Sequence, residues 1–377
     1  MLSIFNGFWE LCLQLFINPF WIVIFLLPAF QISLERIKER QIFGKRLYAP
    51  TPLILRTWYL GVITSLFLSL ILLNFKFTIR AEEVFLVWAC MLFLAIWRIR
   101  FACFSYAVGI LSILSPIVKL LDHSKFISVY GNTWWEVIAQ FSINQWLWLV
   151  CLTHLMECGL IRMAGTEGSL PVQIPHRVGR IVSGFQICKI WPMPIVVFTM
   201  SGWLAIPLMI GFESKSCLKP ISQQQRLSST YVFVLSICIG CLLALSYGWK
   251  PLLWMAVLLS LCGHEVFYWW GKRVERQKEP RFVSDEKGLR VLAVLPQTPA
   301  AEMGLKSGDI IHKLNGVRIS TLEELKQVVE GTAFLKIEVC NDQMDSHFVQ
   351  KALYEDDPKD LGIIGATPVW GTNKGIH

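Results

Sequence analysis

Charge is scarce in this chain of 377 residues: Asp, Glu, Lys and Arg together make up only 16% of it, while 54% of the residues are hydrophobic. Soluble globular proteins carry about 25% charged residues. The apolar residues also gather in long blocks, which continue up to about residue 270. This composition excludes an ordinary soluble fold for most of the chain and indicates a membrane protein.

Short motifs that mark common enzyme sites are missing as well. The sequence has no Gly-x-Ser-x-Gly nucleophile elbow, no Gly-Lys-Ser/Thr phosphate loop and no dinucleotide-binding glycine pattern. A zinc intramembrane protease would need His-Glu-x-x-His, because two His one helical turn apart bind one ion while Glu acts as the base. Here Tyr268 follows His264-Glu265 at the position of the second His. We therefore predict no catalytic residue, no metal site and no cofactor.

Neither a disulfide framework nor a cleaved signal peptide is expected. Most of the 11 Cys, including the closely spaced Cys238 and Cys241, lie in apolar runs, where free Cys behaves as a small hydrophobic residue. The first ten residues carry a single charge, at Glu10, and thus lack the basic start of a signal peptide. We expect this stretch to stay in the mature protein.

Eight apolar segments approach the length of about 20 residues that a helix needs to cross the hydrocarbon core. Asn18-Pro19 interrupts the first segment, and Pro192, Pro194 and Pro207 interrupt the sixth. Since proline frees backbone groups that lipid cannot satisfy, the sixth segment is either a kinked span or a re-entrant hairpin. The segments cover residues 11–33, 57–75, 83–97, 101–121, 137–161, 190–212, 231–249 and 251–270.

Four basic stretches set the expected orientation, because Lys and Arg accumulate in cytoplasmic loops. Eight simple spans would leave the fourth stretch outside, so one segment must fail to cross, and residues 190–212 are the first choice. We predict about seven spans in a membrane domain (1–270), a basic linker (271–281) and a cytoplasmic domain (282–377). The basic stretches comprise Arg36, Lys38, Arg40, Lys45, Arg46 and Arg56; Arg98 and Arg100; Arg162, Arg177, Arg180 and Lys189; and Lys272, Arg273, Arg276, Lys278 and Arg281.

Polar residues inside the apolar segments are functional candidates, because charge is costly in lipid. His154 and Glu157 lie three residues apart and share a helix face, and His264 and Glu265 lie near the end of the last segment. Metal or proton binding is one interpretation. Hydrogen bonding between helices is the simpler one, and we favour it.

After Pro280 the composition changes to that of a small soluble domain. Residues 1–281 hold 25 Lys and Arg against 13 Asp and Glu, a net charge of +12, whereas residues 282–377 hold 10 against 14, a net charge of −4. Asn315-Gly316 is typical of a tight hairpin turn, and Ser320 with Glu323 fits a capping box at a helix start. The expected order is a strand at 289–295, a short helix at 300–303, a hairpin at 308–319, a helix at 321–330 and strands at 334–340 and 347–354.

This order resembles a PDZ domain, and the resemblance is carried by Val294 to Ala301, Gly304 to Ile311 and Leu314-Asn315-Gly316. PDZ domains bind a peptide as an added strand and hold its C-terminal carboxylate on a hydrophobic-Gly-hydrophobic loop. The best match to this loop lies at the far end of the chain. The resemblance therefore implies a permuted α+β PDZ fold, with the ligand strand at the C-terminus, behind an α-helical multispan membrane domain.

The peptide site is assigned to the loop after residue 358 and to the facing helix. A closing edge strand at 361–365 without a ligand is the alternative, and the acidic run at 355–357 would repel a carboxylate. The assigned residues are Leu361, Gly362, Ile363 and Ile364 in the loop and strand, Lys359 as an electrostatic helper, and Thr321, Leu325 and Val328 on the helix.

Over most of its length the chain resembles the MinJ family of cell-division topological determinants from Gram-positive rods. The resemblance implies a non-catalytic scaffold that bridges the curvature-sensing polar protein DivIVA to the membrane ATPase MinD in division-site selection. It also implies a multi-pass cell-membrane protein enriched at poles and septa. The similarity rests on Asn18-Pro19-Phe20, His154 to Glu157 with Arg162, Arg177 to Val182, Trp191 to Pro194 and Asp360 to Ile363.

Two other functional classes stay open. A PDZ-regulated intramembrane protease is opposed by Tyr268, and a secretion or export component is supported by the proline-broken segment and by the His154 and Glu157 pair. The basic stretches also suit an anionic lipid bilayer. Their ordinary meaning is membrane orientation, so the net charge of +8 implies no nucleic-acid partner.

Overall fold

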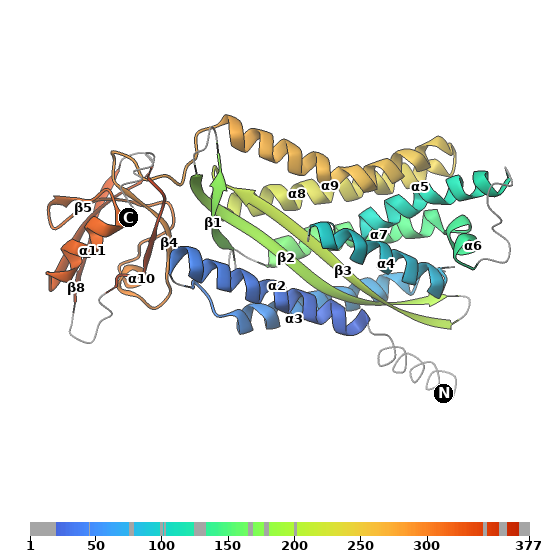
Figure 1. Cartoon of the computed structure of the whole chain (residues 1–377), viewed down its shortest axis with the longest axis horizontal. Coiled ribbons are helices and arrows are strands. Elements are labelled where there is room, and N and C mark those ends of the chain that lie inside the picture. Colours follow the sequence, from blue (N-terminus) through green and yellow to red (C-terminus); the bar gives the residue numbers. More distant parts are fainter. Residues whose placement is uncertain are drawn as a thin grey trace, which may run out of the picture.

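Long helices that run along the longest axis of the molecule form the N-terminal part (Figure 1). The computed structural model describes residues 20–44, 46–74, 79–98, 101, 103–123, 133–164, 169–176, 181–199, 202–341, 345–353 and 360–368. The helices of this part are α2 (Phe20–Phe43), α3 (Pro50–Leu72), α4 (Ala81–Trp97), α5 (Phe104–His123), the short α6 (Thr133–Ala139), α7 (Ile143–Met163), α8 (Ile221–Ser246) and α9 (Pro251–Gln277).

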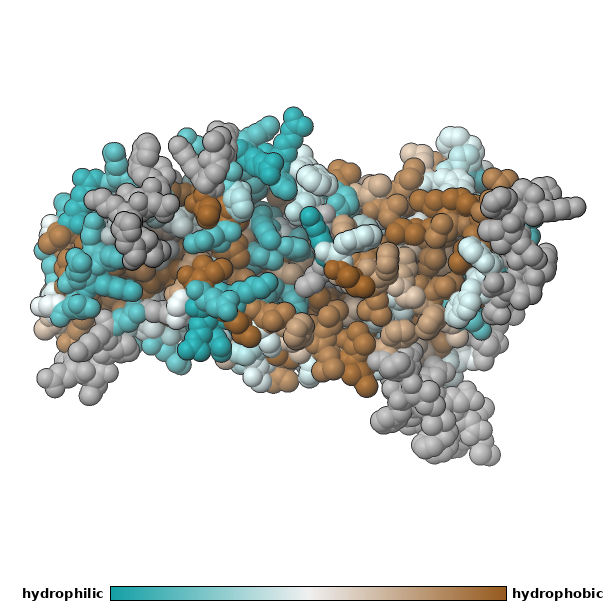
Figure 2. All heavy atoms as spheres, in the orientation of Figure 1, coloured by the Kyte–Doolittle hydropathy of each residue, from teal (hydrophilic) through white to brown (hydrophobic). Residues whose placement is uncertain are grey.

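Six of these helices, α2, α3, α5, α7, α8 and α9, are long and apolar enough to cross a membrane. At about 1.5 Å per residue, the 23 residues of α3 extend about 35 Å and exceed the hydrocarbon thickness of about 30 Å. Apolar side chains such as Ile22, Leu70 and Phe93 are exposed on the outer faces, and Figure 2 shows apolar residues covering this part of the molecule. The prediction of an α-helical multispan membrane domain is confirmed.

The sixth apolar segment forms a β-hairpin and not a kinked helix. Strands β1 (Leu170–Pro175), β2 (Ile181–Thr199) and β3 (Gly202–Ser216) make an antiparallel sheet in the order β1-β2-β3. The hairpin runs obliquely across the helices (Figure 1), and its side chains are largely buried, including Trp191, Met193 and Ile206. Of the two alternatives left open by the sequence, the structure has the hairpin.

The prolines of the hairpin occupy positions where a strand can do without an amide donor. Pro194 faces Pro207 across the hairpin, and since neither can donate, this pair is of the type without inter-strand hydrogen bonds. The nitrogens of Pro194 and of Pro192 therefore point away from β3. Val196, two residues further, also directs its N–H outward and donates to Ser69 Oγ of α3 at 2.9 Å. Proline at the outward positions thus removes donors that would otherwise need a partner in apolar surroundings.

The C-terminal part is an α+β domain with a single sheet in the order β8-β7-β5-β4-β9, and β6 pairs with β5. Asn315 and Gly316 join β5 to β6 with φ angles of 51° and 84°, which confirms the predicted tight turn. The order of elements agrees with the expected permuted arrangement. The elements are β4 (Leu289–Val294), α10 (Pro299–Glu302), β5 (Ile310–Leu314), β6 (Val317–Arg318), α11 (Leu322–Glu330), β7 (Phe334–Cys340), β8 (Ser346–Ala352) and β9 (Ile363–Gly365).

The capping box of α11 lies one residue later than the sequence pattern suggested. Thr321 is the N-cap, and its side chain accepts a hydrogen bond from the Glu324 N–H at 3.2 Å. The Glu324 carboxylate in turn accepts from the N–H groups of Thr321 and Ser320. The predicted pair of Ser320 and Glu323 is therefore wrong, because Thr321 is still extended, with φ −128° and ψ 159°, and the first helical residue is Leu322.

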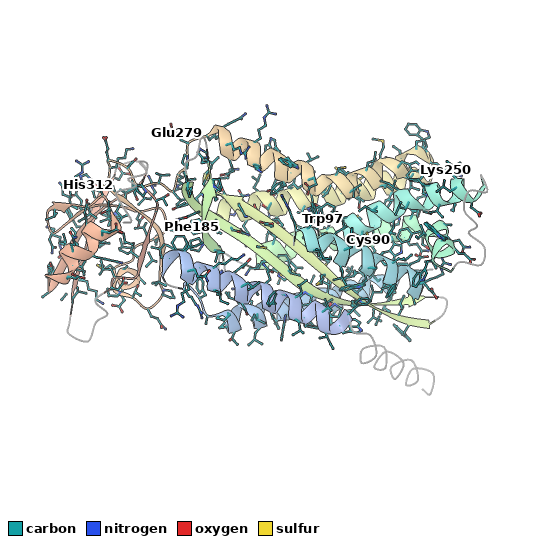
Figure 3. All side chains as sticks on the ribbon, in the orientation of Figure 1. Cys90, Trp97, Phe185, Lys250, Glu279 and His312 are labelled. Carbon is teal, nitrogen blue, oxygen red and sulfur yellow. The ribbon has the colours of Figure 1, made fainter. Side chains whose placement is uncertain are left out.

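The C-terminal domain packs against the end of the membrane part formed by the α2–α3 turn and the base of the hairpin (Figure 1). One apolar cluster contains Leu47 from the turn, Phe185 from β2 and Phe282 and Ile364 from the C-terminal domain. The rings of Phe185 and Phe282 meet edge to face at 5.0 Å between centroids. Figure 3 shows Phe185 at this end and Lys250, in the α8–α9 turn, at the opposite end. Helix α9 continues to Gln277, so residues 271–277 of the expected linker are helical.

Candidate peptide-binding groove and buried polar cluster

A shallow groove lies between α11 and the segment that leads into β9. Strand β9 stands at the end of the sheet and pairs antiparallel with β4. The pocket in the groove is small, about 20 Å³, so a peptide side chain needs α11 and the loop to separate slightly. Its lining residues are Leu322, Leu325, Lys326, Val329, Asp360, Leu361 and Ile363.

The structure brings together some of the assigned peptide-site residues and separates others. Leu325, Leu361 and Ile363 line the same pocket. Thr321 serves as the helix cap instead, and Ile364 points to the opposite face of the sheet, into the cluster shared with the membrane part. Val328 packs at the margin of the domain core and does not line the pocket. Lys359, the acidic run at 355–357, Asn18-Pro19 and Arg177 to Arg180 lie outside the described residues.

Sequence reasoning missed three groove residues on α11. Leu322, Lys326 and Val329 follow one another at helical spacings of four and three residues. The assigned Thr321, Leu325 and Val328 follow one another at the same spacings of four and three residues, so spacing alone does not select the side that faces the groove. The packing of α11 beside Leu361 and Ile363 selects it.

Gly362 shapes the loop at the end of the groove. Its φ of +79° lies in the left-handed region, and a Cβ atom there would overlap the side chain of Thr298. The Gly362 carbonyl accepts from the Leu295 N–H at 2.8 Å, which ties the loop to the end of β4. The Gly362 N–H donates to Asp360 Oδ1 at 2.9 Å. In PDZ domains, backbone N–H groups of this loop bind the C-terminal carboxylate of the peptide. Here the Asp360 carboxylate already accepts the hydrogen bond from one such group, the Gly362 N–H.

Hydrogen bonds fix the C-terminal domain to the hairpin as well as to its own sheet. The Thr367 N–H donates to Ser183 Oγ at 2.9 Å, and the Ser183 N–H donates to Thr367 Oγ1 at 3.1 Å. The Arg281 N–H donates to the Cys217 carbonyl at 2.8 Å. Cys217 is itself held by Glu275 of α9, whose carboxylate accepts from the Cys217 N–H. The groove therefore has a defined position relative to the membrane part.

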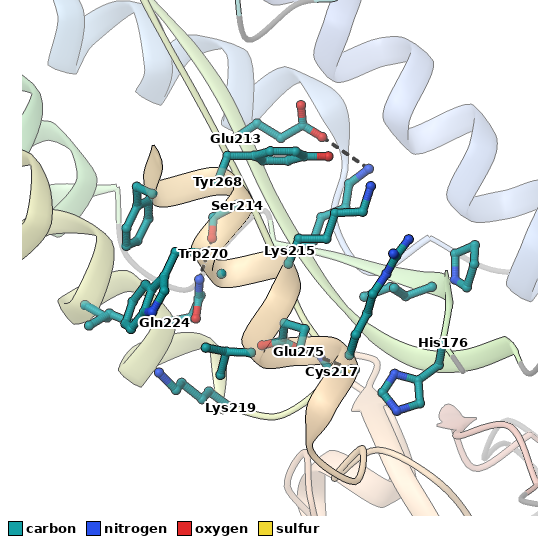
Figure 4. A pocket seen from close by; sticks show the side chains of 18 residues that line it. His176, Glu213, Ser214, Lys215, Cys217, Lys219, Gln224, Tyr268, Trp270 and Glu275 are labelled. Atoms are coloured by element: carbon teal, nitrogen blue, oxygen red, sulfur yellow. Dashed lines mark hydrogen bonds and ion pairs between the residues drawn. The ribbon is translucent and has the colours of Figure 1, made fainter. Parts of the chain in front are cut away.

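A larger cavity of about 280 Å³ lies between the base of the hairpin, α8 and α9, close to the C-terminal domain (Figure 4). Phe267 and Trp270 give it an apolar wall, and Lys215 pairs with Glu213 at 3.1 Å. Cations outnumber carboxylates in the lining, which suits an anionic group attached to an apolar chain. The basic lining residues are Lys215, Lys219, Lys272 and Arg276, accompanied by His176.

The four polar residues that the sequence marked as functional candidates inside the apolar segments lie at two separate places in the structure. His154 and Glu157 of α7 meet His264 of α9, with 3.1 Å between His154 Nδ1 and Glu157 Oε2 and 3.9 Å between Glu157 Oε2 and His264 Nε2. Glu265 lies apart and accepts from the Tyr106 hydroxyl at 3.2 Å. Cys103, just before α5, joins the group of His154, Glu157 and His264. Sequence reasoning missed this contact because Cys103, α7 and α9 are far apart along the chain.

Comparison with known proteins agrees with both parts of the structure. The PDZ domain family matches residues 290–335. The chain is 25% identical over 378 aligned residues to "Cell division topological determinant MinJ" of Bacillus subtilis (strain 168), covering 93% of this chain and 92% of the relative. Two serine proteases match over much shorter stretches: HTRA1 of Xenopus laevis, 34% identical over 20% of this chain, and a do/HhoA-like periplasmic protease of Haemophilus influenzae, 37% identical over 21%. Each of these covers 17% of the protease.

Proposed function

We propose that this chain, a MinJ-like multi-pass membrane protein with a C-terminal PDZ domain, is a non-catalytic scaffold that acts in cell division by binding protein partners. The groove between α11 and β9 carries the proposal. An edge strand beside a helix with an apolar face is the geometry by which PDZ domains add a peptide strand. Similarity to a cell-division determinant over 93% of the chain supports the division role.

The proposed partners follow from the MinJ resemblance. The scaffold would bridge the polar curvature-sensing protein DivIVA to the membrane ATPase MinD, and septa would thereby be kept away from the poles. Enrichment of the protein at poles and septa belongs to the same proposal. The membrane part supplies the anchor, and the PDZ groove supplies one contact for a partner.

A role without catalysis is supported by two observations. The two serine proteases match only about a fifth of this chain, so their similarity does not suggest a protease activity for the membrane part. Tyr268 stands where a zinc intramembrane protease needs its second His, and its phenol takes the place of an imidazole beside His264 in the small cavity that both residues line.

We propose that the PDZ domain faces the cytoplasm. Lys38 and Arg98 line one cavity together with Leu170 at the start of β1, and the basic end of α9 lies next to the PDZ domain (Figure 1). Basic residues from separate stretches thus gather at one end of the helices, as the positive-inside rule expects for the cytoplasmic side. A fluorescent reporter at the C-terminus should be active in the cytoplasm, and alkaline phosphatase fused there should be inactive. The reverse result would contradict this orientation.

Anionic lipid is the partner that we propose for this end of the membrane part. The cavity of about 280 Å³ combines Lys219, Lys272 and Arg276 with the apolar Phe267 and Trp270. A phosphate headgroup would contact the cations while an acyl chain follows the aromatic wall. Native mass spectrometry should show retention of phosphatidylglycerol by the wild type and weaker retention by Lys219→Glu, whereas equal retention of phosphatidylcholine would contradict the proposal.

The groove is tested by a matched pair of substitutions on α11. Leu322→Lys places a charge in the groove, whereas Gln327→Lys adds the same charge on the exposed face of the same helix. We expect Leu322→Lys to abolish co-purification of division proteins and to disperse a fluorescent fusion from the septum. Gln327→Lys should leave both unchanged. Equal behaviour of the two variants would exclude the groove as the partner site.

A further inference from the structure

We propose that the cluster of Cys103, His154, Glu157 and His264 is a structural metal site, with Zn²⁺ as the preferred ion, that joins α7, α9 and the start of α5. One potential ligand atom from each residue lies within 4.8 Å of all the others. The ligands come from three segments that are distant along the chain, so the site would hold the middle of the helical bundle together.

The distances within the cluster suit a small tetrahedral ion. Zn²⁺ binds N and O ligands at about 2.1 Å, which places two tetrahedral ligands about 3.4 Å apart. Glu157 Oε2 lies 3.1 Å from His154 Nδ1 and 3.9 Å from His264 Nε2, on either side of that value. The remaining pairs of ligand atoms lie within 4.8 Å of one another, so the site must contract to bind an ion.

The cluster contains buried polar atoms that lack a hydrogen-bond partner in the described part of the chain. The side chains of His154 and Glu157 are 1% and 0% exposed, and Cys103 is 1% exposed. His154 Nε2, Glu157 Oε1 and His264 Nε2 are buried and have no hydrogen-bond partner in the described part of the chain. Of these three atoms, His264 Nε2 is one at which the ion would bind. Leaving it unpaired in apolar surroundings is costly, and metal coordination would offset this cost.

The donor set points to zinc and to a structural role. Thiolate, imidazole and carboxylate are the ligands that Zn²⁺ takes in proteins, whereas Ca²⁺ and Mg²⁺ prefer oxygen alone. A Cys thiolate and a Glu carboxylate together balance the two positive charges of the ion, so the loaded site is neutral inside the bundle. Four protein ligands leave no open position for a water or a substrate, which is the mark of a structural site.

An approach to the cluster exists on the side of α9. His264, the most exposed of the four with 15% of its side chain accessible, lines a small cavity together with Tyr106 and Glu265. An ion could reach His264 from this cavity before the buried ligands close around it. Glu265 lies at the cavity and is not one of the four ligands.

The test is metal analysis of the full-length protein purified in detergent without a His-rich tag. After removal of loosely bound ions by a chelator and reloading with Zn²⁺, we expect about one Zn²⁺ per chain by mass spectrometry. Cobalt substitution should give a thiolate-to-cobalt charge-transfer band and the intense visible bands of tetrahedral Co²⁺. Added Zn²⁺ should raise the melting temperature of the wild type, because an ion that binds only the folded state stabilises it.

Substitutions distinguish this site from adventitious binding. Cys103→Ser should lose the charge-transfer band and weaken Zn²⁺ binding by about tenfold or more, and His264→Gln should lower the stoichiometry. Cys151→Ser, which removes another buried thiol from α7, should keep both signals. A wild type without stoichiometric Zn²⁺, or a charge-transfer band that persists in Cys103→Ser, would overturn the proposal. Circular dichroism of each variant confirms that a lost signal does not come from unfolding.

Discussion

Gly362 is the residue on which the conformation of the proposed peptide loop depends. Any other L-amino acid at its φ of +79° is strained by about 1–2 kcal/mol, and a Cβ would also overlap Thr298. We therefore expect Gly362→Ala to destabilise the PDZ domain by about 2 kcal/mol or more. Gly331→Ala is the control, because a Cβ at position 331 meets open space. Hydrogen exchange of residues 289–365 in the full-length protein measures the difference, and equal protection in both variants would contradict it.

Asp360 accepts a hydrogen bond from the Gly362 N–H, a group that a bound peptide carboxylate would otherwise use. Its Oδ1 accepts from the Gly362 N–H at 2.9 Å, and its charge repels an incoming carboxylate. Asp360→Asn removes the charge at nearly constant size, so peptides with a free C-terminus should bind several-fold more tightly. Amidated versions of the same peptides should show no gain. Fluorescence titration with peptides selected by display on the wild type checks this, and a gain that is equal for amidated peptides would refute carboxylate recognition.

At the level of residues, the sequence located the loop better than the helix that faces it. Leu361 and Ile363 could be chosen because a hydrophobic-Gly-hydrophobic triplet is a local pattern. The side of the helix that faces the groove could not be selected, since the set assigned from the sequence and the set found in the pocket have the same spacings of four and three residues. The packing of α11 beside Leu361 and Ile363 decides between them, and packing is a property of the folded domain.

Among the elements, the β2–β3 hairpin departs most from what its composition suggests. An apolar segment of 23 residues is long enough for a helical span, yet three prolines make it a poor helix. Proline is compatible with a strand where the N position faces outward, and Pro194 and Pro207 meet at such a pair. Helix α3 on the outer side of β2 then provides an acceptor, Ser69 Oγ, for the hydrogen bond that the Val196 N–H donates. The hairpin is stable because α3 covers it.

The close contact between α3 and β2 depends on Gly61. A Cβ at position 61 would overlap the carbonyl oxygen of Pro192, a backbone atom that cannot move aside alone. Gly61→Ala should therefore push α3 away from the hairpin and lower the stability of the membrane part by about 1–3 kcal/mol. Gly159→Ala, in α7 with open space around it, should be neutral or stabilising by up to about 1 kcal/mol. Thermal unfolding in detergent compares the two, and a neutral Gly61→Ala would show that the contact is not tight.

On the scale of the whole molecule, the hairpin connects the membrane part to the PDZ domain. Its base contributes Phe185 to the shared apolar cluster and Ser183 to the hydrogen bonds with Thr367. The same region contacts α9 through Glu275. Ile364 of β9 belongs to the same apolar cluster, so β9 is held against the base of the hairpin.

The docking of the PDZ domain can be loosened without altering either part. Ser183→Ala together with Thr367→Val removes both hydroxyls of the reciprocal pair, and each lost hydrogen bond should cost about 1 kcal/mol. We expect faster hydrogen exchange at residues 281–285 and 364–368, with unchanged protection of β5 and β7. Thr332→Val, which removes a hydroxyl bonded to the Val328 carbonyl within the PDZ domain, is the control. If the double variant exchanges like the wild type, the hydroxyl pair does not hold the domain.

The class of each part could be read from the sequence, because hydropathy, basic stretches and turn-forming residues are local properties of the chain. The sequence predicted a polytopic helical membrane part followed by a PDZ domain, and both are found. Tertiary structure alone decided three things: that the proline-rich segment is a hairpin, that Cys103, His154, Glu157 and His264 meet, and that the PDZ domain docks on Phe185 and Ser183. These depend on contacts between residues far apart in the chain, and their energies exist only once the helices have packed.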